Sequence, residues 1–205
     1  MKTQVEEVNR NIYDIKNKDD YEFKMKKGLN REIVEEISAK KNDPDWMREI
    51  RLKALETYEK LELPTWGPDL SELKMDEIAT YVKPKSKLNS SWDDVPEDIK
   101  NTFDKLGIPE AEKTSLAGVG AQYDSELVYH NVRKEVEEQG VVYTDMESAL
   151  NGPYAEMVKE HFMKLVPPSD HKFAALHGAV WSGGSFVYVP KGVSVAIPLL
   201  SLIHI

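Results

Sequence analysis

Near the carboxyl end of the chain the apolar residues change from a helical to a strand-like spacing, and this change constrains the fold more than any other feature. Apolar side chains alternate over residues 185–189, and they alternate again over residues 193–197, after turn residues at 190–192. Alternation with a period of two, interrupted by Gly and Pro, is typical of short successive strands. We therefore predict that a strand-rich domain begins near Lys172 and that this sequence holds only its first part.

The residues before this change predict helices. Asn30 is a suitable cap for a short helix, and Asp43 with Pro44 predicts a longer helix to about residue 61, with Asp43 as the N-cap and Pro44 in the first turn. The longer helix has one apolar face, and its charged residues are expected to point outward: Arg48, Glu49, Arg51 and Glu56. The apolar face packs within a helical bundle of this chain, or it docks onto a missing domain or a partner subunit.

Further elements follow in the middle of the chain. The patterns first predict a helix that starts at Pro96 and is ended by Gly107 and Pro109. A strand over 127–130, a charged helical turn over 133–139 closed by Gly140, and a strand over 141–143 follow. The last two predicted elements are a helix capped by Thr144 or Asp145 and a helix over 153–165. Pro167 and Pro168 then mark the clearest boundary, since neither residue continues a helix.

Two glycine motifs suggest chemistry but do not fit it. Residues 118–123 resemble a phosphate-binding loop, yet Tyr123 stands where a dinucleotide fingerprint needs its third Gly, so a tight turn before a strand is favoured over nucleotide binding. Residues 182–185 contain two serines, but Val187 stands where a nucleophile elbow requires Gly around Ser185. No acid, base and nucleophile occur together elsewhere, so we predict no catalytic residues.

Metal ligation without cysteine would depend on histidine and carboxylate side chains. The candidates are His130, His161, His171 and His177, together with Glu126, Glu160 and Asp170. Glu126 and His130 are four residues apart, which is not the Glu-x-x-His spacing of di-iron bundles, and Glu160 directly precedes His161, so these two side chains diverge on a helix. Surface or hydrogen-bonded histidines are therefore favoured over a metal site, and we assign no metal or cofactor residues.

Composition excludes several classes of function. The chain has 27 basic and 36 acidic residues and a net charge of −9, which argues against a protein that binds the nucleic-acid backbone. It has no cysteine, so it forms no disulfide and cannot by itself ligate an iron-sulfur cluster through thiolates. There is no signal-peptide pattern, and the apolar run over 193–205 is shorter than the roughly 20 residues of a membrane span. We therefore expect a cytoplasmic protein without membrane contact.

Several long motifs together resemble the SufB family of iron-sulfur cluster assembly proteins. They are, in order, residues 37–47 (ISAKKNDPDWM), 51–55 (RLKAL), 64–68 (PTWGP), 118–131 (GVGAQYDSELVYHN) and 172–198. The resemblance extends from about Tyr21 to Pro198, which is most of the chain.

The resemblance implies a scaffold subunit of a SufBCD-type complex and no enzyme, with ATP hydrolysed by the partner ATPase SufC. It implies a second partner, the related SufD, a sulfur donor protein, and an iron-sulfur cluster in the full-length family member. The groups that build the cluster are implied to lie beyond this sequence, so no site residue is transferred to it. The alternative is that the helical region acts alone as a protein-interaction module that docks a sulfur donor or partner subunit. A β-helix enzyme acting on carbohydrate is disfavoured, because the strand segment lacks paired acidic residues.

The fold class that we expect is α+β, a mainly helical region followed by the first strands of a truncated right-handed parallel β-helix. The expected divisions are a polar arm over residues 1–29, the helical region with a few short strands over 30–166, the start of the β-helix over 167–199, and a non-native tail over 200–205. The tail is suspected because the resemblance ends abruptly near Leu200. A β-helix coil is stabilised by its neighbours, so we expect unpaired strand edges and an apolar face after residue 185.

Overall fold

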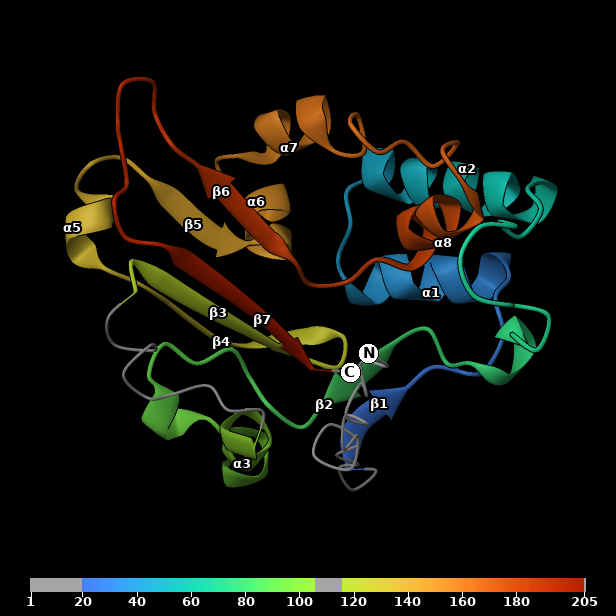
Figure 1. Ribbon diagram of the computed structural model, residues 1–205, viewed down its shortest axis with the longest axis horizontal. Helices are drawn as coiled ribbons and strands as arrows, with labels where there is room; N and C mark the ends of the chain where they lie inside the picture. Colours follow the sequence, from blue (N-terminus) through green and yellow to red (C-terminus); the bar gives the residue numbers. More distant parts are fainter. Residues whose placement is uncertain (1–19, 106–115, 205) are drawn as a thin grey trace, which may run out of the picture.

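The computed structural model describes residues 20–105 and 116–204, which form small sheets and short helices around several apolar clusters (Figure 1). The helices are α1 (Arg31–Lys40), α2 (Asp45–Lys60), α3 (Glu97–Lys105), α5 (Lys134–Glu137), α6 (Met146–Asn151), α7 (Ala155–His161) and α8 (Lys172–Val180), with 3-10 turns η2 (Met75–Glu77) and η3 (Trp92–Asp94). The strands are β1 (Tyr21–Lys24), β2 (Val82–Pro84), β3 (Gly118–Tyr123), β4 (Glu126–Val132), β5 (Val142–Asp145), β6 (Ser185–Tyr188) and β7 (Leu199–His204).

The helices α1, α2 and α8 pack together on one side of the molecule (Figure 1). The Asn30 side chain accepts a hydrogen bond from the Ile33 N–H and caps α1, as the sequence predicts. The contact of α2 with α8 is close, because a Cβ on Gly178 would lie 2.8 Å from the Cβ of Ala54. The apolar face of α2 is therefore buried within this chain, in agreement with the helical-bundle interpretation.

The predictions for Asp43 and Arg51 are wrong. Helix α2 begins at Asp45 with Pro44 as its N-cap residue, and Asp43 caps nothing. The Asp43 carboxylate instead accepts a hydrogen bond of 2.6 Å from Nε of Arg51, and both side chains are completely buried. Nη1 of Arg51 also donates to the carbonyls of Ala179 and Trp181, at 3.3 and 2.9 Å. Arg51 thus lies inward because the carbonyls that end α8 need donors.

The strand-rich domain predicted to begin near Lys172 starts with a helix that the sequence analysis does not predict, because residues 172–180 form α8. The Nδ1 atom of His171 accepts hydrogen bonds from the N–H groups of Phe173 and Ala174 and caps this helix. Strand structure starts at β6, and the predicted turn follows, with the Val193 N–H donating to the Pro190 carbonyl. The predicted strand over 193–197 is absent; these residues form an irregular connection in which Val193 and Val195 pack against a small apolar cluster.

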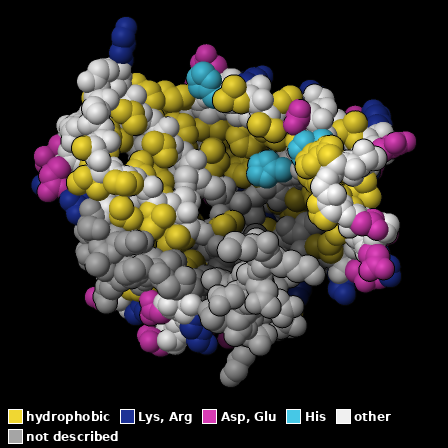
Figure 2. Space-filling model, viewed as in Figure 1, with side chains coloured by type: hydrophobic (Ala, Val, Ile, Leu, Met, Phe, Trp, Pro, Cys, Tyr) yellow, Lys and Arg dark blue, Asp and Glu magenta, His cyan; other side chains and the backbone are white. Residues whose placement is uncertain are grey.

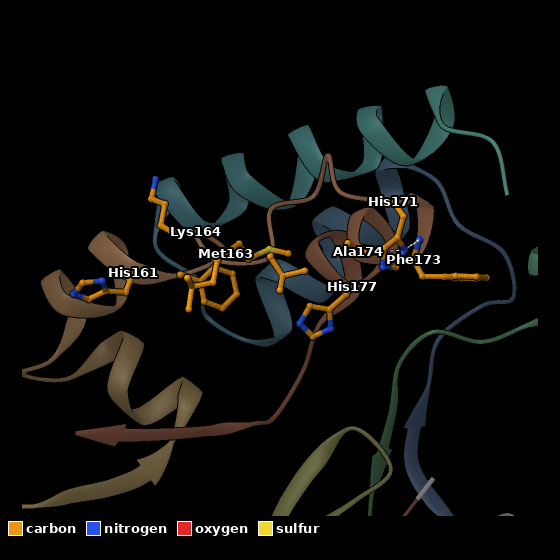
Figure 3. A pocket seen from close by; sticks show the side chains of 10 residues that line it. His161, Met163, Lys164, His171, Phe173, Ala174 and His177 are labelled. Carbon is orange, nitrogen blue, oxygen red and sulfur yellow. Dashed lines mark hydrogen bonds between the residues drawn. The ribbon is translucent and has the colours of Figure 1, made fainter. Parts of the chain in front are cut away.

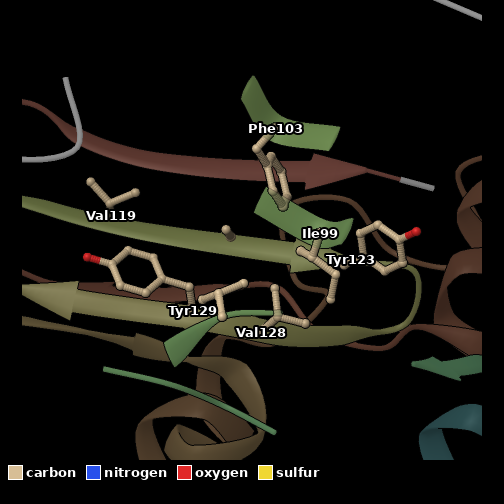
Figure 4. Packing of buried hydrophobic residues seen from close by; sticks show 8 residues of the cluster. Ile99, Phe103, Val119, Tyr123, Val128 and Tyr129 are labelled. Carbon is tan, nitrogen blue, oxygen red and sulfur yellow. The ribbon is translucent and has the colours of Figure 1, made fainter. Parts of the chain in front are cut away.

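The described strands form three small sheets and no β-helix coil. Strand β3 pairs antiparallel with β4 and parallel with β7, β5 pairs antiparallel with β6, and β1 pairs antiparallel with β2. Helix α3 covers the β3–β4 sheet, where Ile99 and Phe103 meet Val119 and Tyr129 (Figure 4). Residues 200–204 of the tail that we expect to be non-native lie in β7, at an edge of this sheet.

Residues 118–123 form a buried strand and not the predicted tight turn. The spacing of Gly118 and Gly120 has a packing cause. A Cβ at either glycine would lie less than 3 Å from the Tyr143 side chain, which crosses this strand. The glycines therefore admit an aromatic ring and not a phosphate.

Further predictions concern the middle of the chain and its amino-terminal residues. The turn over α5 with Gly140, the strand β5 and the Asp145 cap of α6 are confirmed. From Tyr21 onward the predicted polar arm is part of the folded structure, because β1 pairs with β2 and Met25 is only 3% exposed. Residues 1–19 and the predicted helix end at Gly107 and Pro109 lie outside the described residues.

Replacement of Arg51 by Met is expected to lower the free energy of unfolding by about 3–5 kcal/mol, because it leaves the Asp43 carboxylate buried without its cation. The matched control is Arg48→Met in the same helix, whose exposed pair with Asp45 contributes about 0–1 kcal/mol. Urea unfolding followed by tryptophan fluorescence measures both. Equal losses in the two variants would contradict the buried pair.

Candidate functional site

The histidines named as candidate ligands do not converge. His171 is engaged as the cap of α8, His161 ends α7, and His177 extends from α8 (Figure 3). His130 lies against the ring of Tyr143, with 4.9 Å between the ring centroids. Within residues 20–105 and 116–204, no group of three or more His, Cys, Asp or Glu side chains is placed to hold a metal ion.

A pocket of about 450 Å³ lies between the end of α7 and helix α8 (Figure 3). The predicted helix over 153–165 ends early, at His161, and Met163 has a positive φ of 53°. Leu165 and Val166, which follow after Lys164, are open to solvent, at 98% and 56% exposure. Of the apolar residues in the predicted helix, Val158 is buried and Leu165 is not. The lining is suited to apolar contact and carries no acid–base pair.

A buried ionic cluster connects the helices to the sheets, and sequence patterns did not predict it. Nζ of Lys41 lies 2.8 Å from Oε1 of Glu126 and 2.9 Å from Oε1 of Glu147, and the lysine side chain is only 4% exposed. The Tyr81 hydroxyl donates to the same Glu126 oxygen at 2.5 Å. Glu126 lies 85 residues from Lys41 in the sequence and Glu147 lies farther away still, so no local spacing reveals the cluster.

The cluster lines a cavity of about 620 Å³ between β1, β2, β4 and the end of α1. Burial, together with the hydrogen bond to Glu126, raises the pKa of the Tyr81 hydroxyl, so this group stays protonated as a donor. The Lys41 ammonium is paired with two carboxylates, those of Glu126 and Glu147. A charged lysine and a protonated tyrosine make the cluster a structural joint and not a nucleophile with its base.

The side chains of Glu147 and Gln122 hold the serine–glycine segment over residues 182–185. The N–H of Gly183 donates to Oε1 of Glu147 at 2.7 Å, and the N–H of Gly184 donates to the Gln122 side chain at 3.1 Å. Ser185 forms a hydroxyl–hydroxyl contact with Ser201 and none with a histidine. The segment connects α8 to β6.

Comparison with known proteins places this architecture in a family. Residues 29–200 match the model of the SufBD protein N-terminal region. The chain belongs to the SufBD family. Residues 29–200 include the Arg51–Asp43 pair, the Lys41 cluster and all three helices of the α1–α2–α8 group.

Curated relatives of this SufBD chain are named as iron-sulfur cluster assembly proteins. The iron-sulfur cluster assembly protein SufB of Bacillus subtilis (strain 168) is 54% identical over 193 residues, which are 94% of this chain and 41% of that protein. An iron-sulfur cluster assembly SufBD family protein of Staphylococcus haemolyticus (strain JCSC1435) is 55% identical over 183 residues, 89% of this chain and 39% of the relative. The chain thus spans about two fifths of the length of these relatives.

Among the helices of the described ranges, none combines the length and the apolar character that crossing a bilayer needs.

Protonation of His130 is expected to make stability depend on pH. Burial lowers the pKa of its imidazole below the ordinary 6.5, against the opposing effect of Asp145 and Glu137. The unfolded chain therefore binds the proton more readily, so the stability present above about pH 6.5 decreases as the pH falls toward the lowered pKa. Urea midpoints from about pH 7.5 to about pH 5.5 should fall less steeply in His130→Gln than in the unchanged chain. Identical slopes would show that His130 is not the titrating group.

Replacement of Lys41 by Met is expected to lower the free energy of unfolding by about 2–4 kcal/mol, because Glu126 and Glu147 lose their shared cation. The control is Lys40→Met, the neighbouring residue, whose contacts with Glu36 and the Phe23 ring are partly exposed and contribute about 1 kcal/mol or less. The urea midpoint measures both variants, and a smaller loss at Lys41 than at Lys40 would refute the role of the cluster.

Proposed function

We propose that this chain is the N-terminal part of a SufB-like scaffold subunit on which iron-sulfur clusters are assembled. The observation that supports the proposal is the identity of 54% over 193 residues with the Bacillus protein named SufB, together with the family match over residues 29–200. The match covers helices and strands alike, so it does not favour an isolated helical docking module.

The part of the scaffold in this chain has a supporting role. Iron-sulfur clusters are held mainly by cysteine thiolates, and this chain has no cysteine. The cluster, as the cargo of the complex, would form on residues of the longer parent subunit. We propose that a right-handed parallel β-helix follows this region and carries them.

The proposed partners come from the same family relationship. The parent subunit would pair with a SufD-like paralogue and a SufC-like ATPase and would receive sulfur from a donor protein in the cytoplasm. ATP hydrolysis belongs to the SufC-like partner, so the subunit itself is no enzyme. The ordered helices and sheets of this chain would act as a rigid base for those contacts.

A chimera tests the proposed function. Residues 1–199 of this chain replace the matching region of Bacillus SufB in a strain depleted of its own SufB, and the activity of an iron-sulfur enzyme is measured in extracts. We expect the chimera to restore most of this activity, whereas a chimera with Arg51→Met, which disturbs the α2–α8 contact, restores less in proportion to its lost stability.

The control chimera carries Arg48→Met, whose exposed ion pair contributes little to folding, and it should restore activity fully. A chimera that accumulates to the normal level but restores no iron-sulfur enzyme activity would contradict the proposal.

A further inference from the structure

The connection that follows α2 carries an exposed tryptophan. We call residues 61–73 of this connection the Trp66 loop; it runs beside the start of α8, on the right in Figure 1. Trp66 is 63% exposed, and Leu63 and Leu73 are 38% and 36% exposed. Figure 2 shows apolar and acidic side chains next to each other on this side of the molecule. Tryptophan is highly buried on average in folded proteins, so an indole in this position indicates a contact surface.

The exposed Trp66 is nevertheless held in place. Pro64 and Pro68 restrict the backbone on both sides of it, and Gly67 adopts a φ of 91°, which other residues avoid. The indole ring also meets the imidazole of His171 edge-on, with 5.6 Å between the ring centroids. That imidazole is itself fixed, because it caps α8. A partner that binds the indole therefore orders little that is not ordered already, which favours affinity.

The Trp66 loop is also acidic. It has three carboxylates, those of Glu62, Asp69 and Glu72, and no lysine or arginine. All three side chains are exposed, and in the part of the chain that the structure describes no basic side chain pairs with them. Hydrogen bonds from the N–H and then the hydroxyl of Ser71 lower the pKa of Asp69 below its ordinary value, so this carboxylate is ionised at neutral pH. Carboxylates around an exposed indole make a surface that is complementary to cations.

A basic segment that contains arginine satisfies both features of the loop. A guanidinium group stacks on an indole face and also forms paired hydrogen bonds with a carboxylate, whereas an ammonium group does not form such pairs. The net charge of −9 attracts a basic segment over some distance. An apolar segment that covered the loop would remove three carboxylates from water without giving them partners, which is costly. Charge complementarity therefore favours a basic occupant over an apolar one.

We infer that the Trp66 loop docks a basic, arginine-containing segment of a separate protein. One guanidinium group lies over the indole of Trp66, and further basic side chains face the carboxylates of the loop. The inference goes beyond the proposed function, because it concerns a contact with another protein and requires no iron-sulfur cluster. Other parts of the same polypeptide and a second copy of this chain are the competing occupants, and the experiment distinguishes them.

Fluorescence anisotropy of a labelled peptide tests the inference on the purified full-length chimera and on the 205-residue chain. The probe is a synthetic peptide of alternating arginine and serine, and the control peptide has glutamate in place of arginine. We expect the arginine peptide to bind both proteins and the glutamate peptide to bind neither, and we expect added salt to weaken the binding. The measurement involves no cluster assembly, so its failure is distinct from a failure of the chimera to restore enzyme activity.

Variants of the loop separate specific docking from general attraction to an acidic protein. Trp66→Ala should raise the Kd of the arginine peptide roughly tenfold or more, and Trp66→Phe, which keeps an aromatic face, should raise it less. The matched apolar control is Leu165→Ala, at an exposed residue outside the loop, and it should leave the Kd unchanged.

A second pair of variants tests the charge of the loop. Asp69→Asn should raise the Kd roughly twofold to fivefold, because it removes one exposed carboxylate beside the indole. Its control is Glu135→Gln in α5, which removes the same charge from an exposed position outside the loop and should leave the Kd unchanged. Unchanged urea midpoints show that each variant is folded.

Three results would overturn the inference. One is equal affinity of the arginine peptide for Trp66→Ala and for the unchanged protein, or no binding to either. Another is binding to the 205-residue chain but not to the full-length chimera, which would make another part of the same polypeptide the occupant. The third is a doubled mass of the chain in light scattering that Trp66→Ala abolishes, which would make a second copy the occupant.

Discussion

The fold of this SufBD region depends on the antiparallel contact of α2 with α8, and two cations join these helices in a reciprocal way. Arg51 of α2 donates to the carbonyls that end α8, and Nζ of Lys172 at the start of α8 donates to the carbonyls of Tyr58 and Leu61 at the end of α2. Each helix therefore satisfies the last carbonyls of the other. Asp43 neutralises the buried guanidinium, so the contact requires both charges and the loop that carries Asp43.

The Lys41 cluster continues this arrangement from the helices to the sheets. Lys41 follows α1 directly, Glu126 starts β4, and Glu147 lies in α6 and also binds the N–H of Gly183. An apolar contact would hold these elements together without fixing their register, whereas a buried ammonium between two carboxylates admits few geometries. The end of α1, the start of β4 and helix α6 are thus aligned by charge pairs and not by one large apolar core.

Local signals in the sequence predicted what depends on neighbouring residues. The Asn30 and Asp145 caps and the turn at Gly140 each involve atoms within a few residues, and all three are present. The burial of Arg51 depends on carbonyls 128 and 130 residues away, which no helical period reveals.

The alternating residues near the carboxyl end were misleading in a different way. The pattern over residues 185–189 is real, but it was extended backward over α8, whose small residues are buried against two helices and have little periodicity of their own. The Gly118 and Gly120 pair shows the same limit, because its cause is the ring of Tyr143 from another strand. The sequence therefore predicts an element correctly where the interactions that cause it are local. It predicts incorrectly where packing between distant segments decides which residues are buried and how glycines are spaced.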